Sequence, residues 1–337
     1  MSTQKFITQI KFMKKNKILV TGAAGFVGSH LVEKLIKKKY KVVCFDRYNS
    51  NNDFGWLNKI RSKNKKNFIL GDIRDFDSVY NAMKGCKVVF HLAALIGIPY
   101  SYISPVAYLK TNVEGTYNVL EAARRLKIKN VIVTSTSEVY GSAKYLPINE
   151  NHPINSQSPY AASKSAADQL AMSFYKSFNL PVKIIRPFNI YGPRQSQRAI
   201  IPTIISQTLN KSKNITLGNV KPTRDFNYVL DVVDAFVKIM NSKKAIGQVL
   251  NVGSNKRISI SYLCNEILKI AKIKKNLKIS TERKRPKLSE VENLQSDNKK
   301  IRKILSWSPK TKLKQGLKYT ITWFKNNKTE NSKDYTV

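Results

Sequence analysis

The chain of 337 residues contains few cysteines, few histidines and few acidic residues. Its three cysteines, Cys44, Cys86 and Cys264, are odd in number, far apart and set in apolar surroundings, so they form neither a disulfide nor a metal-ligand pattern. The three histidines do not cluster with them. We therefore expect no metal site.

Long hydrophobic runs are also missing. No apolar segment reaches the roughly 20 residues that a membrane helix needs, and the N-terminus has no apolar stretch ending in a small-residue cleavage site. We expect a soluble, cytoplasmic protein with no membrane partner. Residues 1–15 precede the first predicted strand and form an N-terminal extension, and residues 327–337 are polar enough for a flexible tail.

The shortage of acidic residues leaves a net charge of +39, from 60 basic and 21 acidic side chains. Such a charge is typical of nucleic-acid-binding proteins. However, 47 of the 60 basic residues are lysines, and they are spread along the whole chain, whereas phosphate-tracking surfaces concentrate charge and favour arginine. We predict no nucleic-acid partner, although a positive field would still attract an anionic substrate.

The chain does contain a regular alternation of short apolar runs and amphipathic stretches. Continuous apolar runs, typical of parallel strands covered on both faces, lie at 17–20, 41–45, 67–70, 87–90, 131–135 and 182–186. Helical patterns are found at 26–38, 105–126, 159–179, 200–210, 231–241, 259–271, 297–305 and 313–325, with a further strand at 214–218. The pattern predicts an α/β fold: a Rossmann-type doubly wound parallel sheet over 16–190 and a smaller mixed α/β C-terminal substrate lobe over 191–326.

Three glycines, Gly22, Gly25 and Gly28, follow the first predicted strand in TGAAGFVGSH. This spacing allows a tight turn and brings backbone amides to a pyrophosphate at a helix N-terminus, although three glycines alone could reflect turn chemistry only. Asp46 ends the second strand, where an acidic side chain would accept hydrogen bonds from an adenosine ribose. That position favours NAD over NADP, although the adjacent Arg47 weakens the exclusion of a 2′-phosphate. The alternative for Asp46 is a residue that only caps the loop.

Tyr160 and Lys164 form a YxxxK spacing that places both side chains on one helix face. The lysine ammonium would stabilise the phenolate and lower the pKa of the tyrosine from about 10. The spacing is common by chance, so an ordinary helix face is the alternative. Thr136 could bind the same substrate hydroxyl. Glu138, in TSTSEVYG, adds a carboxylate that hydride chemistry on an alcohol does not need, which implies a second step, removal of a proton from carbon.

Together these motifs resemble the extended short-chain dehydrogenase/reductase family, specifically its sugar-nucleotide epimerases and dehydratases. The resemblance covers roughly residues 15 to 325 and rests on several motifs in the family's order. Besides those above, they are GDIRD (71–75), HLAA (91–94), TNVEGT (111–116), YAASK (160–164), RPFNIYGPR (186–194) and TRDFNYVLD (223–231).

The resemblance implies a bound NAD, a nucleotide-sugar substrate and a homodimer. The cofactor-binding residues that it implies are Gly22, Gly25, Phe26, Val27, Gly28, Asp46, Arg47, Asp72, Ile73, Leu92, Ala93, Ala94, Asn112, Thr134, Tyr160, Lys164 and Pro187. The implied catalytic residues are Thr136, Ser137, Glu138, Tyr160 and Lys164. The implied substrate-binding residues are Tyr100, Ser101, Glu138, Asn189, Arg194, Arg224 and Arg285.

Within this family, the triplet before VYG separates the chemistries. Sugar 4-epimerases have no carboxylate there, whereas 4,6-dehydratases place a glutamate where Glu138 stands, and the dTDP-glucose dehydratases have Asp in place of Ser137. The Thr-Ser-Glu triplet is similar to that of GDP-mannose dehydratases and UDP-glucuronate decarboxylases. The segments around 91–105 and 186–205 most closely resemble GDP- or UDP-N-acetylglucosamine 4,6-dehydratases of legionaminic acid biosynthesis, which make precursors of surface polysaccharide.

The sequence therefore predicts an NAD-dependent 4,6-dehydratase in which Glu138 serves as both base and acid, because serine is too weak an acid to replace an aspartate. UDP-glucuronate decarboxylation and sugar 4-epimerisation are the alternatives within the fold. The uncharged segment IGIPYSYIS (96–104) suits neutral hydroxyls better than a substrate carboxylate. A dinucleotide-binding scaffold without catalysis would be expected to have lost Tyr160, Lys164 or Glu138, and all three are present.

Overall fold

A seven-stranded parallel sheet forms the centre of the protein, with the strand order β11-β6-β5-β4-β1-β2-β3. The computed structural model describes residues 17–63, 65–281 and 286–327. The strands are β1 (Lys17–Thr21), β2 (Lys41–Arg47), β3 (Phe68–Gly71), β4 (Cys86–His91), β5 (Asn130–Thr134), β6 (Val182–Pro187) and β11 (Val249–Val252). This architecture confirms the predicted Rossmann-type α/β fold.

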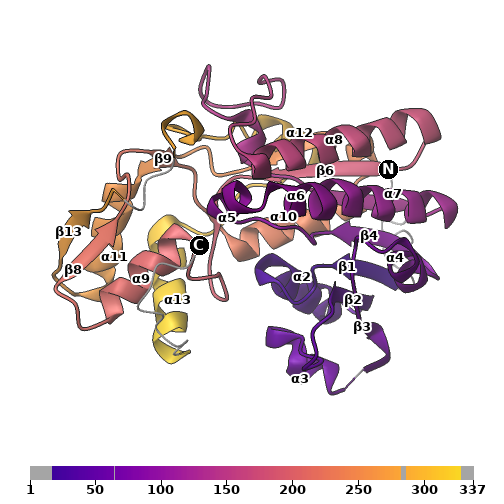
Figure 1. Ribbon diagram of the computed structural model, residues 1–337, viewed down its shortest axis with the longest axis horizontal. Helices are drawn as coiled ribbons and strands as arrows, with labels where there is room; N and C mark the ends of the chain where they lie inside the picture. The colour runs from indigo at the N-terminus through magenta and orange to yellow at the C-terminus, as the bar shows by residue number, and fades with distance from the viewer. Residues whose placement is uncertain (1–16, 64, 282–285, 328–337) are drawn as a thin grey trace.

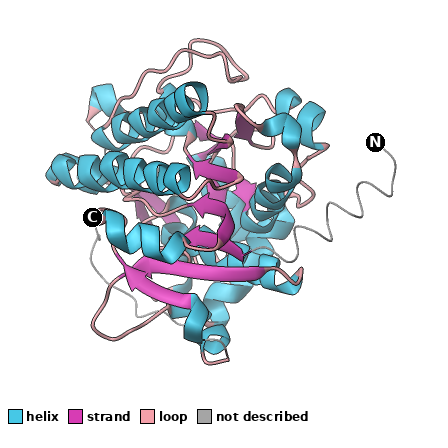
Figure 2. Ribbon diagram, turned by 90° about the vertical axis from the view of Figure 1, so that its right-hand side faces the viewer, coloured by secondary structure: helices cyan, strands magenta, loops and turns pink. Residues whose placement is uncertain are grey.

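Helices cover both faces of the sheet (Figures 1 and 2). They are α2 (Phe26–Lys37) and α10 (Val229–Asn241) on one face, and α4 (Phe76–Met83), α7 (Gly115–Arg125) and α8 (Pro159–Phe178) on the other. Successive residues of a strand point to opposite faces, so Ile18 and Val20 pack with α2 and α10 while Leu19 packs in the second core. Burial on both sides explains why the strands are continuous apolar runs.

The amphipathic stretch predicted over 105–126 is not one uniform helix. It consists of α6 (Pro105–Tyr108), a π-helical segment η3 (Leu109–Glu114) and α7. A π-helical turn inside a helix often marks a functional position, and this one contains Asn112, whose side chain contacts two other segments. The short helices of the N-terminal half are η1 (Gly55–Leu57), α3 (Asn58–Arg61), η2 (Lys65–Asn67), α5 (Ile98–Ile103) and η4 (Ser137–Tyr140).

The C-terminal half contributes β7 (Ile190–Tyr191), α9 (Ile200–Leu209), β8 (Asn214–Leu217), β9 (Thr223–Arg224), β10 (Asn227–Tyr228), η5 (Lys243–Ala245), β12 (Ile258–Ser259), α11 (Ile260–Ala271), β13 (Asn276–Ile279), η6 (Lys287–Ser289), α12 (Lys299–Leu305) and α13 (Leu313–Asn326). Of these, α9, β8, α11, β13 and α13 form a smaller group at the left of Figure 1, whereas α12 packs against β11 of the central sheet. Strand β11, which was not predicted, comes from this half and forms one edge of the central sheet. The division at 190/191 stays a prediction. Arg285, the extension before residue 17 and the tail after residue 327 lie outside the described residues.

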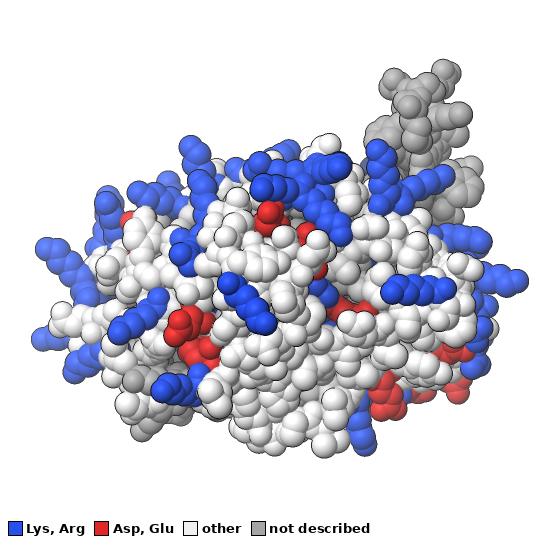
Figure 3. Space-filling model, turned by 90° about the horizontal axis from the view of Figure 1, so that it is seen from above, with Lys and Arg blue, Asp and Glu red and all other residues white. Residues whose placement is uncertain are grey.

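Basic side chains are scattered over the face seen in Figure 3, with a region toward its lower edge where no charged side chain is drawn. Within the described ranges, no helix is long and apolar enough to cross a membrane. The same ranges hold no group of three or more His, Cys, Asp or Glu placed to bind a metal ion. The three cysteines are free and buried.

Candidate active site

The predicted motifs meet at one edge of the sheet. Because all seven strands are parallel, their carboxyl ends lie along the same edge, which is where ligands bind in such sheets. Gly22 follows β1, Asp46 lies near the end of β2, Thr134 ends β5 and Pro187 ends β6. Motifs more than a hundred residues apart are thus brought to one place.

The glycine turn after β1 can be built only with glycine at two positions. Gly22 has φ +69°, and a Cβ there would lie 2.8 Å from the backbone nitrogen of Ala93. A Cβ on Gly28 would lie 2.0 Å from the carbonyl oxygen of Gly22. Gly25 is the N-cap of α2 and supplies no side-chain cap, so the first N–H groups of the helix, starting at Phe26 and Val27, point out of the turn. A helix start of this kind suits a pyrophosphate.

Asp46 binds the glycine turn directly. Its carboxylate accepts hydrogen bonds from the backbone N–H of Ala24 at 2.6 Å and of Arg47 at 2.8 Å. Burial raises the pKa of Asp46, and these two backbone donors oppose that effect. Each carboxylate oxygen keeps a second lone pair for a further donor. The loop-capping alternative is therefore realised in the structure, and it leaves room for a ribose contact as well.

The end of β3 carries Asp72 and Ile73, which have different environments. Hydrogen bonds from Arg74 hold the pKa of Asp72 below its usual range. Ile73 is buried, and its side chain fills the space beside Gly115. Ile73 is placed for apolar packing, whereas the carboxylate of Asp72 is paired with an arginine.

The HLAA segment is fixed by a chain of hydrogen bonds that the sequence did not reveal. Thr21 Oγ1 accepts from the backbone N–H groups of Leu92 and Ala93, both at 3.2 Å, and bonds His91 Nδ1 at 2.8 Å. The other ring nitrogen of His91 bonds Thr116 Oγ1 at 3.0 Å. Burial lowers the pKa of His91 to about 3, so the ring is neutral and acts as a fixed spacer between β1, β4 and α7.

Asn112 positions the loop that follows this segment. Its Oδ1 accepts from Leu95 N at 2.8 Å, and its Nδ2 donates to Leu95 O and to Ser163 Oγ, both at 2.9 Å. The side chain is buried, and both its polar atoms are taken by protein partners. Asn112 thus supports the contact between the loop and α8, and its predicted contact with the cofactor stays a prediction.

Tyr160 and Lys164 lie one turn apart on α8, and both are buried. Lys164 Nζ donates to the carbonyl oxygen of Thr134, and Thr136 hydrogen-bonds the Tyr160 side chain. Burial lowers the pKa of Lys164 to about 8. The pKa of Tyr160 is raised, first by burial, against the Thr136 hydrogen bond. In the protein alone, burial thus raises the pKa of Tyr160, and the lowering by Lys164 that the sequence predicts stays a prediction.

Glu138 and Ser137 lie in the short helix η4. Thr136 caps this helix, since its Oγ1 accepts from Glu138 N at 3.2 Å. Ser137 is buried, whereas Glu138 is partly exposed. The negative charge of Glu138 raises the pKa of Tyr160, which places carboxylate and phenol in one site. The structure therefore brings together all five predicted catalytic residues.

Three predicted residues leave buried polar atoms for a ligand. Thr134 Oγ1, Asn189 Oδ1 and Arg194 Nη1 have no hydrogen-bond partner within the described part of the chain. Thr134 and Asn189 lie at or just beyond the ends of the neighbouring strands β5 and β6. Buried polar atoms are normally paired, so a bound molecule with donors at this edge would satisfy the oxygen atoms of Thr134 and Asn189. Together with the glycine turn, they fit a dinucleotide and a polar substrate.

The other predicted substrate-binding residues differ in their placement. Tyr100 is 39% exposed, whereas Ser101 is fully buried and donates to Ile98 O at 2.7 Å within α5; the substrate contact of Ser101 stays a prediction. Arg224 donates to the carbonyl oxygens of Thr223 and Glu292 and pairs with Glu290 at 3.3 Å.

Arg194 is anchored on the cofactor side of the edge. It pairs with Glu33 of α2 at 2.8 Å, and its guanidinium lies over the ring of Trp56. Glu33 belongs to the helix that begins at the glycine turn. The remaining nitrogen, Nη1, is buried and has no hydrogen-bond partner within the described residues, so the substrate contact of Arg194 stays a prediction.

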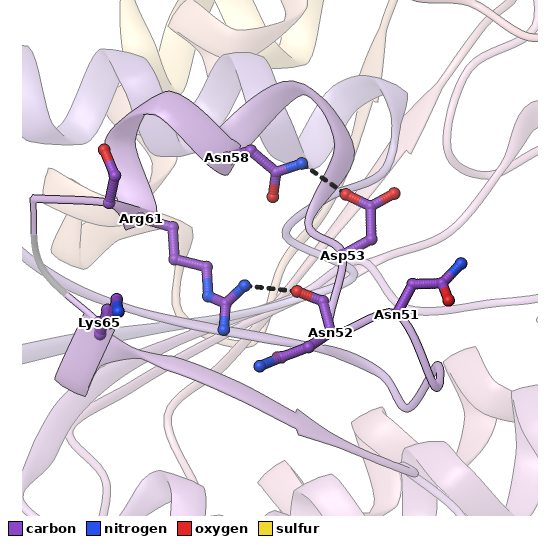
Figure 4. Close-up of a pocket in the computed structure, with 7 residues that line it drawn as sticks. Asn51, Asn52, Asp53, Asn58, Arg61 and Lys65 are labelled. Carbon is purple, nitrogen blue, oxygen red and sulfur yellow. Dashed lines mark hydrogen bonds between the residues drawn. The ribbon is translucent and has the colours of Figure 1, made fainter.

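A polar cavity of about 500 Å³ lies beyond the end of β2 (Figure 4). In it, Asn58 donates to Asp53, and Arg61 donates to the carbonyl oxygen of Asn52. None of the predicted site residues lines this cavity. The candidate active site is therefore located by the predicted residues at the carboxyl edge of the sheet, and not by this cavity.

Three functional candidates were missed from the sequence: Ser135, Asp168 and Arg186. Asp168 Oδ2 accepts from Ser135 Oγ at 2.7 Å and from Arg186 Nε at 2.9 Å. A signal was available, because Asp168 follows Lys164 by four residues and so continues the same helix face. Its partners on β5 and β6 could not be read from that spacing.

Comparison with known proteins identifies the family of the chain. Residues 19–320 match the family described as GDP-mannose 4,6 dehydratase. The chain therefore belongs to this family of extended short-chain dehydrogenase/reductase enzymes, the sugar-nucleotide dehydratases and epimerases.

Individual relatives span several reactions. A putative UDP-glucose 4-epimerase of Methanocaldococcus jannaschii is 36% identical and covers 92% of this chain and 99% of its own. The human dTDP-D-glucose 4,6-dehydratase is 31% identical, covering 92% and 90%. The structure of dTDP-glucose 4,6-dehydratase from Bacillus anthracis in complex with NAD has a TM-score of 0.81 at 28% identity, covering 93% and 97%. A UDP-N-acetyl-α-D-glucosaminuronate decarboxylase also matches.

Proposed function

We propose that the protein is an NAD-dependent 4,6-dehydratase of a nucleotide-diphosphate hexose. The observation that carries the proposal is the position of Glu138, whose charge acts on the phenol of Tyr160. Oxidation of a secondary alcohol requires only the Tyr160–Lys164 pair. A carboxylate in the same site can in addition take a proton from the carbon next to the ketone.

The cofactor is NAD, held at the glycine turn and Asp46. NAD supplies reversible hydride acceptance at the sugar 4-position when it is bound. Asp46 accepts hydrogen bonds from the ribose through its free lone pairs, and as an anion it repels a 2′-phosphate. The backbone N–H groups at the start of α2 bind the pyrophosphate.

The protein residues manage the proton transfers. Tyr160, as the phenolate that the ammonium of Lys164 favours, takes the proton of the 4-hydroxyl and becomes a phenol. The 4-ketone acidifies the hydrogen on carbon 5, and Glu138 removes it. Glu138 then gives this proton to the departing 6-hydroxyl, which leaves as water. Ser137 orients the glutamate, because a serine hydroxyl is too weak an acid for that step. Carbon 5 must regain a proton when the hydride returns to carbon 6, and the proton that Tyr160 took balances it.

The substrate is GDP- or UDP-N-acetylglucosamine, the substrate of the legionaminic acid enzymes that the segments around 91–105 and 186–205 resemble. Tyr100 lies at the sugar, and Asn189 and Arg224 bind the diphosphate. The unpartnered Oδ1 of Asn189 supports this assignment for Asn189. Arg285 belongs to the same proposed set, on the sequence resemblance alone.

Decarboxylation of a UDP-hexuronate is a second candidate, and one contact favours it. The charge of Arg198 lowers the pKa of Tyr108, whose ring packs edge-on against Tyr160. A cation therefore approaches the side of the site that the sequence suggested was uncharged, and it could pair with a substrate carboxylate. The residues of α5 itself carry no charge, and for that reason dehydration is preferred.

Mass spectrometry separates the candidates. The purified protein is incubated with GDP-N-acetylglucosamine, UDP-N-acetylglucosamine and UDP-glucuronate in parallel. Dehydration predicts loss of one water from one of the first two and no change in the third. Loss of carbon dioxide from UDP-glucuronate would replace the proposal by the decarboxylase, and an isomer of unchanged mass would replace it by the epimerase.

The functional unit is a homodimer joined through the face of α6, η3 and α7. An exposed apolar stripe runs along these helices, formed by Val106, Leu109 and Tyr117, with exposed fractions of 59%, 54% and 45%, and Ile103 at the end of α5 is also exposed, at 67%. Val106 and Leu109 are three residues apart and so share a face. An exposed contiguous apolar patch commonly marks an interface.

A further inference from the structure

We propose that Asp168 is a positioning residue of the active site: its buried carboxylate fixes the segment 134–138 against α8 and supplies the negative charge that keeps Lys164 an ammonium ion. The inference rests on the proposed function in one respect, namely that Tyr160 and Lys164 carry the oxidation step. The arrangement of Asp168 itself is independent of the substrate.

Asp168 shares a helix face with the Tyr160–Lys164 pair. Tyr160, Lys164 and Asp168 follow one another at intervals of four along α8, so they lie on the same side of the helix, one turn apart. Their exposed fractions are 8%, 4% and 3%. An aspartate is almost never buried to this degree unless it is paired, so Asp168 needs a reason to be there.

Ser135 and Arg186 hold the carboxylate of Asp168 in place. Oδ2 takes all the described contacts: Ser135 Oγ at 2.7 Å, and Arg186 through Nε and Nη2, both at 2.9 Å. Oδ1 is buried and has no hydrogen-bond partner within the described residues. Ser135 stands between Thr134, which accepts from Lys164, and Thr136, which bonds Tyr160. The hydrogen bond that Ser135 donates to Asp168 therefore fixes the strand end that contacts both catalytic side chains.

A hydrogen-bond network extends from the ion pair of Asp168 and Arg186. Arg186 donates to the hydroxyl of Tyr140 at 3.0 Å, and this hydroxyl donates to Asn251 Oδ1 at 2.8 Å. Asn251 in turn donates to Ile148 O at 3.1 Å. The network joins α8, β5, β6, β11 and η4. Because Tyr140 belongs to η4, it also fixes the helix that carries Glu138.

The charged groups around Lys164 show which of them stabilises its ammonium form. Lys164 is buried, which lowers its pKa, and Asp168 is the group that raises it. From β4, His91 is neutral. Asp168 also raises the pKa of Tyr160, but it is the last of the five causes there, so its main effect falls on Lys164.

Other charged or titratable groups face this cluster from the elements packed against α8. They are Arg186 from β6, Glu138 and Tyr140 from η4, and Tyr108 from α6. From η3 the neighbour is the neutral Asn112. On α7, Glu121, Arg124 and Arg125 pair with one another. Among the described contacts, Asp168 is thus the one anion that favours the ammonium form of Lys164.

The direct test is the titration of Lys164, followed by NMR on protein labelled at the lysine ε-carbon. Most lysines titrate near 10.4, whereas Lys164 and Lys183 are expected near 8 and 7, so both are resolved from the rest. Lys164→Met and Lys183→Met assign the two signals. In Asp168→Asn, we expect the midpoint of Lys164 to fall by about 1 pH unit, while that of Lys183 stays in place.

A second variant guards against misfolding, because a lone buried Arg186 is destabilising. The double variant Asp168→Asn/Arg186→Met removes both charges and should show the same shift of Lys164. Ser135→Ala keeps the charge but removes the hydrogen bond; we expect an unchanged Lys164 midpoint and a fall in kcat of about fivefold. The matched control is Glu121→Gln, which removes another carboxylate bound by arginine and should leave both readouts unchanged.

Turnover gives the functional readout. The alkaline limb of the kcat–pH profile should move down with the midpoint of Lys164 in Asp168→Asn and in the double variant. The inference would be overturned if the titration midpoint of Lys164 stayed unchanged in both Asp168→Asn and the double variant. It would also be overturned if that midpoint shifted while the alkaline limb of the kcat–pH profile stayed in place. Because the NMR titration needs no substrate, failure of the proposed reaction would leave that part of the test intact and would be recognised separately from the product mass.

Discussion

Lys164 of α8 donates a hydrogen bond from its ammonium to the backbone carbonyl oxygen of Thr134 at the end of β5. This contact ties the helix that carries Tyr160 to the strand that leads into Thr136 and Glu138. The catalytic groups are thus placed by one strand end and one helix rather than by a mobile loop. The chemistry proposed for Glu138 depends on this shared frame.

The first prediction concerns Glu138. Glu138→Gln keeps the size and the hydrogen-bonding capacity of the side chain but cannot accept the proton from carbon 5. We expect water elimination to stop, with a loss of at least about a hundredfold for a missing general base, while partial reduction of the bound cofactor persists in its absorbance. Glu114→Gln, on the exposed side of η3, is the control. Unchanged turnover in Glu138→Gln would refute the role.

The second prediction concerns Gly28. In Gly28→Ala the new Cβ would lie 2.0 Å from Gly22 O, so the first turn of α2 must move away from the glycine turn. Overpacking of this kind costs about 2 kcal/mol. We expect a lower thermal midpoint and at least tenfold weaker NAD binding by calorimetry. Gly97→Ala is the control, because a Cβ there would lie 3.5 Å from its nearest neighbour, Tyr108 Oη. Equal NAD affinities of Gly97→Ala and Gly28→Ala would argue against binding of the cofactor at the glycine turn.

The third prediction concerns the buried Lys183. Its Nζ donates to the carbonyl oxygens of Ile239 and Met240 at the end of α10, and burial lowers its pKa to about 7. The unfolded lysine, with a pKa near 10.4, binds more protons than the folded one between these values, so stability rises with pH over that window.

We therefore expect the wild type to gain stability relative to Lys183→Met between pH 7 and about 10, with a slope of up to about 1.4 kcal/mol per pH unit. Urea unfolding of both proteins at several pH values measures the difference, in which other titrating groups cancel. A difference that is flat with pH would show that Lys183 keeps an ordinary pKa.

The fourth prediction concerns association. Leu109→Glu places a charge in the apolar stripe of α6, η3 and α7, and a buried unpaired charge at an interface is costly. We expect sedimentation to change from dimer to monomer. Ile279→Glu, on an equally exposed residue of β13, should leave the dimer intact. A wild type that sediments as a monomer would remove the proposal.

The sheet was predictable because its strands are buried on both faces and therefore appear as continuous apolar runs. Strand β11 escaped because it has four residues, VLNV, and one of them is the buried Asn251, which bonds Ile148 and Tyr140. A polar residue in so short a run removes the apolar signal. The hydrogen bonds that satisfy it come from residues about a hundred positions away.

The spacing of Tyr160 and Lys164 predicted their shared helix face, and the structure places both on one side of α8. That spacing could not show that burial is the largest cause of both pKa shifts. The Thr21–His91–Thr116 chain depends on the pairing of β1 with β4, which no local pattern reveals. The burial of Ser101 was not predictable either, because a buried hydroxyl and an exposed one look alike in sequence.

The central claim is that water is lost while the hydride returns within the same sugar, and a deuterium label tests it most directly. GDP- and UDP-N-acetylglucosamine carrying deuterium at carbon 4 are incubated with the protein, and the products are examined by mass spectrometry and NMR. The account predicts a product of one of the two that has lost one water and carries its deuterium at carbon 6. Deuterium that stays at carbon 4 in both sugars without loss of water, or that is lost to solvent, would contradict it.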